Sequence, residues 1–184
     1  MATLLAIPIL GVLLVLQMAV ISRVPLLHGT PDLVLLVVIA WALQKRVQTA
    51  WRWGIIGALL VGFVSALPIW AVLLIYPAAS AVGLALRRRV WHAPILAMFI
   101  ATFVVTLLAH TISFLALRLS GGGLPPLQAL NLVTLPAILL NLVIAIPTYY
   151  ILADLAKWLH GREQKSLACH FLPQTALPRP QCRR

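Results

Sequence analysis

An uncharged apolar stretch, residues 53–86, lies between two clusters of basic residues. As a single helix it would be about 50 Å long, whereas the hydrocarbon core of a membrane is about 30 Å thick. Pro68 lies near its middle, and a proline inside a helix removes a backbone hydrogen bond and clashes with the preceding turn. The pattern therefore predicts two helices, 52–67 and 69–86, folded into a hairpin whose basic ends lie on the same side of the membrane.

Four further apolar runs flank this hairpin, two before it and two after it. The run that begins at Asp32 is too short to cross by itself and must begin near residue 26 to span. We expect an all-α membrane protein, a six-transmembrane-helix bundle that occupies residues 1–165 as one domain. The four additional spans are expected at 3–21, 26–43, 93–117 and 130–155. Residues 166–184 are polar and contain three prolines, so we expect a disordered cytoplasmic tail there.

The positions of the basic residues predict the orientation, because short loops rich in Lys and Arg stay in the cytoplasm. With six crossings and a cytoplasmic N-terminus, only Arg23 and Arg118 among the basic residues near helix ends lie outside. Both termini are then cytoplasmic. Nine basic residues lie inside: Lys45, Arg46, Arg52, Arg87, Arg88, Arg89, Lys157, Arg162 and Lys165.

Composition supports a membrane protein and excludes several other classes. The chain is 62% hydrophobic and 9% charged, against roughly 25% charged residues in soluble domains. Its formal charge of +11 comes from residues at the ends of apolar runs rather than on one shared face. This distribution indicates contact with anionic lipid and argues against nucleic acid as a partner. Cys169 and Cys182 lie in the expected cytoplasmic tail and predict reduced thiols rather than a disulfide.

Small residues recur at every fourth position along the first arm of the hairpin. Gly54, Ala58, Gly62 and Ala66 would form a flat stripe that lets another helix approach closely. One interpretation is that the returning arm of the same hairpin packs on this stripe. The other is that the stripe accepts a helix of a partner protein.

Asp32 stands at the start of the second apolar run, where two roles are open. Thr30, Pro31 and Asp32 read as a helix start, with Thr30 as the N-cap and Asp32 in the first turn beside the positive end of the helix dipole. Acids near membrane depth are costly and often functional. Asp32, with His28 one turn earlier, is therefore also a candidate for contact with a partner or a polar cavity.

Polar side chains also fall inside the last two apolar runs. We expect Thr102 and Thr106 to bond to the preceding turn of their own helix. Asn131 and Asn141 are expected to form hydrogen bonds across helices, or to cap backbone groups freed by nearby prolines.

His110 is a candidate for proton transfer or metal binding, but the chain has few acids that could assist it. A proton relay needs acidic partners and a metal site needs convergent ligands, yet the chain has only Asp32, Asp154 and Glu163 as acids. We therefore expect His110 to be a packing residue, and we expect no metal and no cofactor. Intramembrane enzymes need clustered carboxylates, a metal set or a nucleophile with its base, so the sequence favours a protein that is not an enzyme.

A series of short motifs resembles a known family. The motifs are Gln17 near the end of the first span, Pro31–Leu36 leading to Trp41–Leu43, Arg52, Gly54–Ala58, Pro94 and Asn141–Pro147. Their order and spacing, over nearly all of residues 3–160, resemble the MreD family of bacterial rod shape-determining membrane proteins. Many members have an aspartate toward the end of the third helix, and this chain has Ser65–Pro68 there instead.

The resemblance implies a non-enzymatic scaffold subunit of the bacterial cell-elongation complex that synthesises peptidoglycan, in the inner membrane. Such a subunit would bind MreC and lie near RodA, a class B penicillin-binding transpeptidase and MreB. The family also resembles, in its six-helix plan, the substrate-binding components of energy-coupling vitamin transporters. That likeness supplies an alternative, a small-molecule-binding component of a transporter, which would need polar groups that converge on an outer-facing cavity. The sequence offers chiefly His28, Asp32 and Arg118 for that purpose.

Overall fold

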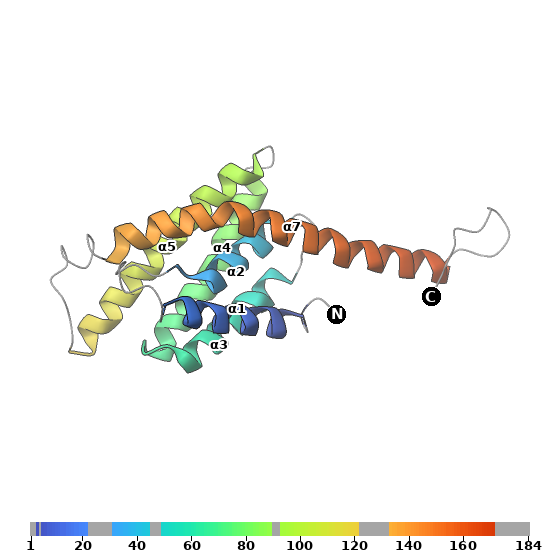
Figure 1. Cartoon of the computed structure of the whole chain (residues 1–184). Coiled ribbons are helices and arrows are strands. Elements are labelled where there is room, and N and C mark those ends of the chain that lie inside the picture. Colours follow the sequence, from blue (N-terminus) through green and yellow to red (C-terminus); the bar gives the residue numbers. More distant parts are fainter. Residues whose placement is uncertain are drawn as a thin grey trace.

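The described part of the molecule is helical. The structure, a computed structural model, describes residue 3 and residues 5–21, 31–44, 49–89, 93–121 and 133–171, with side chains described as far as Trp158 except for residues 20 and 21. Within these ranges the predicted all-α class is confirmed, and no strand occurs. The helices are α1 (Ala6–Ile21), α2 (Leu33–Leu43), α3 (Ala50–Val64), α4 (Ile69–Arg89), α5 (Pro94–Leu119) and α7 (Leu135–Phe171) (Figure 1).

Three of these helices are long and apolar enough to cross a membrane. They are α4, α5 and the part of α7 that ends at Trp158. Helices α1, α2 and α3 are apolar but shorter, and the 11 residues of α2 rise only about 17 Å. Residues 26–30, which the sequence assigns to the same span as α2, lie outside the described residues.

A helical hairpin forms where the sequence predicts one. Helix α3 ends at Val64 and α4 begins at Ile69. In the turn between them, the Ser65 hydroxyl accepts a hydrogen bond from the backbone N–H of Leu67 at 3.1 Å. Gly54 faces Ser80 while Gly62 faces Ile69, so the two helices run antiparallel. The N-terminal end of α3 and the basic C-terminal end of α4 therefore lie at the same end of the hairpin.

Helix α2 is the centre of the bundle. Residues 34–43 are all buried, and α2 contacts α1, α3, α4, α5 and α7; Figure 1 shows it enclosed between α1 and α7. A helix with no polar face is expected to be surrounded on all sides. At its C-terminal end, the ring of Trp41 stacks on that of Trp53 with centroids 4.2 Å apart. Arg87 Nη1 donates to the Gln44 carbonyl oxygen at 2.8 Å, which places a cation at the negative end of the helix dipole.

Helix α7 is longer than the span expected at 130–155. It continues to Phe171, and its C-terminal part projects beyond the other helices (Figure 1). Residues 166–171, expected as the beginning of a disordered tail, are therefore helical, while residues 172–184 lie outside the described residues. Near the end of its apolar part, Lys157 Nζ lies 3.0 Å from Asp154 Oδ1 in an exposed ion pair, which adds local support to the helix.

Candidate functional site

The first feature of the site is the N-cap of α2. Asp32 is itself the cap, and its carboxylate oxygen Oδ1 accepts from the backbone N–H of Leu35 at 3.0 Å. The expectation that Thr30 caps the helix and that Pro31 begins it is wrong, because the helix begins at Leu33. Aspartate is among the best N-cap residues, and at this position its charge also faces the positive end of the dipole.

Side chains from two other helices bind the remaining N–H groups at this end of α2. Gln17 Oε1 on α1 accepts from Leu33 N at 3.0 Å and from Val34 N at 3.4 Å. Asn141 Oδ1 on α7 accepts from Asp32 N at 3.0 Å. The N–H groups at a helix start have no partner within the helix. Here they are satisfied by α1, α7 and the Asp32 side chain, so α2 can begin inside the protein without water.

The hydrogen bonds continue to α4 and α5. The Tyr76 hydroxyl on α4 lies 3.2 Å from Oδ1 and 3.0 Å from Oδ2 of Asp32, and it donates to this carboxylate. Asn141 Nδ2 donates to Thr106 Oγ1 on α5 at 3.1 Å. We call these five residues, Gln17, Asp32, Tyr76, Thr106 and Asn141, the α2 cap cluster. It joins five helices at one point.

A cavity of about 260 Å³ lies beside the α2 cap cluster. Aliphatic side chains of α1, α2, α3 and α4 form part of its wall, and the turn between α3 and α4 closes another part. All five residues of the cluster border it, and three more polar residues do so as well: Ser65, His110 and Ser113. The cavity wall therefore contains both polar and aliphatic groups.

Of the polar residues that the sequence offers for an outer cavity, only Asp32 borders this one. His28 lies outside the described residues. Arg118 is absent from the cavity wall, and its guanidinium carbon lies 5.3 Å from the centroid of the Phe114 ring. His110, expected to be a packing residue, is half-buried and forms part of the cavity wall.

The small-residue stripe packs within the hairpin. Gly54 and Ala58 are buried, and a Cβ on Gly54 would collide with the Ser80 hydroxyl on α4. A Cβ on Gly62 would lie 3.3 Å from the Ile69 side chain. The stripe thus meets the returning arm of its own hairpin, and Gly54 and Ala58 are not accessible to a partner helix. Ala66, in the turn, is the exposed member.

Sequence reasoning missed Tyr76 and misjudged the threonines. Thr106 accepts from Asn141, and Thr102 Oγ1 is buried without a hydrogen-bond partner, so neither shows the bond to the preceding turn expected of it. The across-helix role of Asn141 is confirmed, while Asn131 lies outside the described residues. Tyr76 lies inside an uncharged apolar run, and a buried tyrosine hydroxyl usually has a hydrogen-bond partner. This position could therefore have predicted a polar partner for Tyr76.

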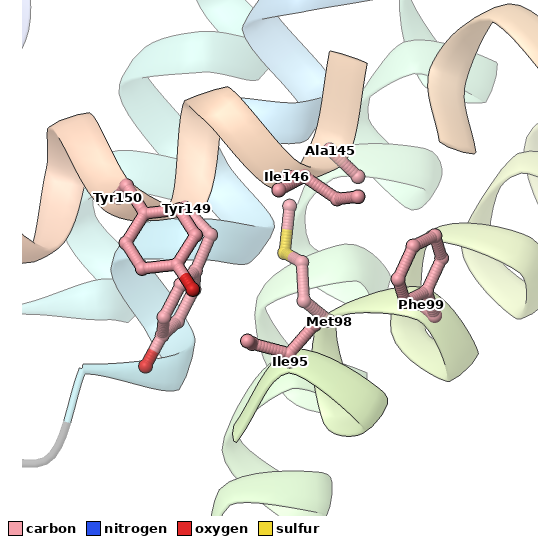
Figure 2. A pocket seen from close by; sticks show the side chains of 7 residues that line it. All are labelled: Ile95, Met98, Phe99, Ala145, Ile146, Tyr149 and Tyr150. Atoms are coloured by element: carbon pink, nitrogen blue, oxygen red, sulfur yellow. The ribbon is translucent and has the colours of Figure 1, made fainter. Parts of the chain in front are cut away.

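A second hollow, between α5 and α7, has no comparable chemistry. Figure 2 shows Ile95, Met98 and Phe99 of α5 facing Ala145, Ile146, Tyr149 and Tyr150 of α7. It has no room for a water molecule. The rings of Tyr149 and Tyr150 meet edge to face with centroids 6.0 Å apart. This hollow is a packing feature of the helix interface.

The α2 cap cluster can hold helices together and can present a carboxylate to the adjoining cavity. Among the described residues, no group of three or more His, Cys, Asp or Glu side chains is placed to hold a metal ion. Comparison with known proteins identifies no relative: no family model matches the chain, and no match is found among curated proteins or solved structures.

Proposed function

We propose that this chain is a non-enzymatic membrane scaffold of the MreD type. In this proposal it crosses the bacterial inner membrane six times with both termini in the cytoplasm. It binds MreC and contacts RodA, a class B penicillin-binding transpeptidase and MreB as part of the cell-elongation complex. What supports the proposal is the way in which the motifs that resemble the family meet around α2.

The motifs meet at both ends of that helix. Gln17 and Asn141, which are far apart in the sequence, both bind backbone N–H groups at the start of α2, beside the Pro31–Leu36 motif. At the other end, Trp41 stacks on Trp53, next to the Gly54–Ala58 motif. Short matches that arose by chance in apolar sequence would have no reason to touch one another. Their convergence on α2 supports the resemblance.

A scaffold also fits the chemistry of the α2 cap cluster. The Tyr76 hydroxyl joins α4 to the Asp32 carboxylate, and Gln17 joins α1 to the start of α2. A rigid centre is what a protein needs in order to present fixed surfaces to its partners. Large apolar side chains on the outer faces of the helices, such as Val12, Phe63 and Val143, are 69%, 81% and 72% exposed. In a membrane such faces contact lipid or the helices of partner proteins.

The experiment is to purify the full chain from its native membrane in mild detergent and to identify what accompanies it. We expect MreC of the same organism. Recovery of an energy-coupling ATPase module in its place would favour the transporter alternative and would overturn the proposal.

A matched pair of variants tests whether the exposed end of the stripe takes part. Ala66 and Ala81 are both exposed, the first in the hairpin turn and the second on α4. If the stripe binds MreC, Ala66→Leu should reduce the recovery of MreC several-fold, while Ala81→Leu should leave it unchanged. Equal recovery with both variants would show that MreC binds another surface.

A further inference from the structure

We propose that the cavity beside the α2 cap cluster binds a small organic ammonium ion, with its charged group at Asp32 and a short apolar body along the aliphatic wall. This ligand class is separate from the scaffold role. Three features of the cavity carry the inference: its charge, its mixed polar and aliphatic wall, and its size.

The charge of Asp32 has no cationic partner in the parts of the chain that the structure describes. Its carboxylate accepts from the Tyr76 hydroxyl and the backbone N–H of Leu35, both of which are neutral donors. The ion pair found in these parts joins Lys157 to Asp154. The start of α2 contributes only about half a positive charge. A partly buried carboxylate in this setting favours a ligand that supplies a full positive charge.

The mixed wall of the cavity matches an amphiphilic cation. Besides Asp32, it includes hydroxyl and amide groups, such as those of Ser113 and Asn141. An ammonium group has three donors and no acceptor, so it needs several oxygen atoms around it. The wall also includes aliphatic side chains, such as those of Val61 and Ile75, which suit a hydrocarbon body.

The volume sets the size of that body. An apolar protein cavity of about 150 Å³ is large enough for benzene, and this cavity measures about 260 Å³. A six-membered ring with an aminomethyl group therefore fits. The cavity is bordered by the Ser65–Leu67 turn, at the end of the hairpin opposite the arginines of α4. Access from the outer side thus rests on the proposed orientation, while the ligand class does not.

The test compares benzylammonium with benzyl alcohol, which has the same ring and no charge. Titration calorimetry on the full-length protein in detergent micelles, with protein-free micelles subtracted, should show benzylammonium binding at least about tenfold more tightly than the alcohol, a difference of roughly 1.4 kcal/mol. Asp32→Asn keeps an oxygen for the Leu35 N–H and removes the charge. It should abolish this preference and leave binding of the alcohol unchanged.

A second variant keeps the proposal testable if Asp32→Asn does not fold. Ala109 borders the cavity, and Ala109→Leu should fill part of it while leaving the Asp32 carboxylate in place. Binding of both probes should then weaken. The proposal is overturned if folded wild-type protein does not bind benzylammonium, if it binds both probes equally, or if neither variant alters binding. None of these results depends on whether MreC copurifies, so the scaffold proposal stands or falls separately.

Discussion

At the scale of single residues, Asp32 combines two roles that the sequence left as alternatives. It caps α2 by accepting from Leu35 N, and it borders a polar cavity. The two roles are compatible because a carboxylate has room for about four hydrogen bonds, so binding one backbone N–H leaves acceptor positions for other groups. One acceptor position binds the backbone N–H of Leu35, and the remaining positions can bind groups in the cavity.

Removal of the Tyr76 hydroxyl should test how much the hydrogen bonds of Asp32 contribute to stability. The Tyr76 side chain is 2% exposed, and Tyr76→Phe would remove the hydroxyl that donates to both carboxylate oxygens of Asp32. We expect the free energy of unfolding to fall by about 1–3 kcal/mol, because a charged acceptor loses a buried partner. Thermal unfolding in detergent would measure this. Tyr150→Phe is the control, since Tyr150 is 53% exposed, and an equal loss in both variants would contradict the prediction.

Part of the α2 cap cluster could be predicted from the sequence, and the partner of Asp32 on α4 could not. Asp32 beside a proline at the beginning of an apolar run predicts a helix start, and an asparagine in a span predicts an across-helix bond. Both signals depend only on near neighbours. Which hydroxyl meets Asp32 depends on the rotation of α4 and its register against α2, and a single sequence contains no information on either.

At the scale of helices, the hairpin was predictable because its signals are strong and local. An uncharged run too long for one crossing and interrupted by Pro68 leaves few other solutions. The partner of the Gly54–Ala66 stripe was not predictable, because small residues at this spacing suit any close helix. The neighbours of α2 were also not predictable, since a helix without a polar face is expected to be surrounded but does not specify by which helices.

The close contact between α3 and α4 at Gly54 leads to a prediction about substitution of this glycine. Gly54→Ala places a methyl group against Ser80 Oγ and 3.1 Å from the Tyr76 carbonyl oxygen, so we expect a loss of about 1–3 kcal/mol in unfolding free energy from overpacking. Gly11→Ala is the matched control, because a Cβ there has nothing within 4 Å. It should be neutral, or stabilising by up to about 1 kcal/mol through helix propensity. Denaturant unfolding of the two variants in parallel provides the comparison, and a stable Gly54→Ala protein would show that the hairpin is looser than described.

The contact between α5 and α7 can be tested by a double-mutant cycle. Asn141 is 1% exposed and donates to Thr106, so Asn141→Ala and Thr106→Val each remove one side of the same bond. We expect the two losses in unfolding free energy not to add, with a coupling of about 0.6 kcal/mol, as is usual for hydrogen bonds between membrane helices. Additive losses would mean that the two side chains act independently. Thr111→Val is a suitable control for Thr106→Val, because Thr111 donates to the Leu107 carbonyl on its own helix at 2.8 Å.

At the scale of the whole molecule, the arrangement depends on a polar point inside an apolar bundle. Apolar helices in a membrane gain little by choosing one neighbour over another, because lipid is equally apolar. Hydrogen bonds at the start of α2 favour particular neighbours, since the N–H groups of Asp32 and Leu33 have their partners on α7 and α1. The number of apolar runs can be read from a sequence, whereas the point at which they converge cannot.

Orientation is the prediction on which the proposed function depends most. If the chain crosses six times with both termini in the cytoplasm, the hairpin turn faces outward and the basic end of α4 faces inward. Ala66 and Arg88 are both exposed, so Ala66→Cys and Arg88→Cys provide one reporter at each end of the hairpin, after Cys169 and Cys182 are replaced by serine. A membrane-impermeant maleimide applied to intact spheroplasts should label Ala66→Cys at least about tenfold more than Arg88→Cys, because short loops rich in Lys and Arg are retained inside. Permeabilised cells, in which both positions should react, control for accessibility. Labelling of both positions from outside would mean that α3 and α4 do not cross as a hairpin, and labelling of Arg88→Cys alone would invert the bundle and place the cavity beside Asp32 on the cytoplasmic side.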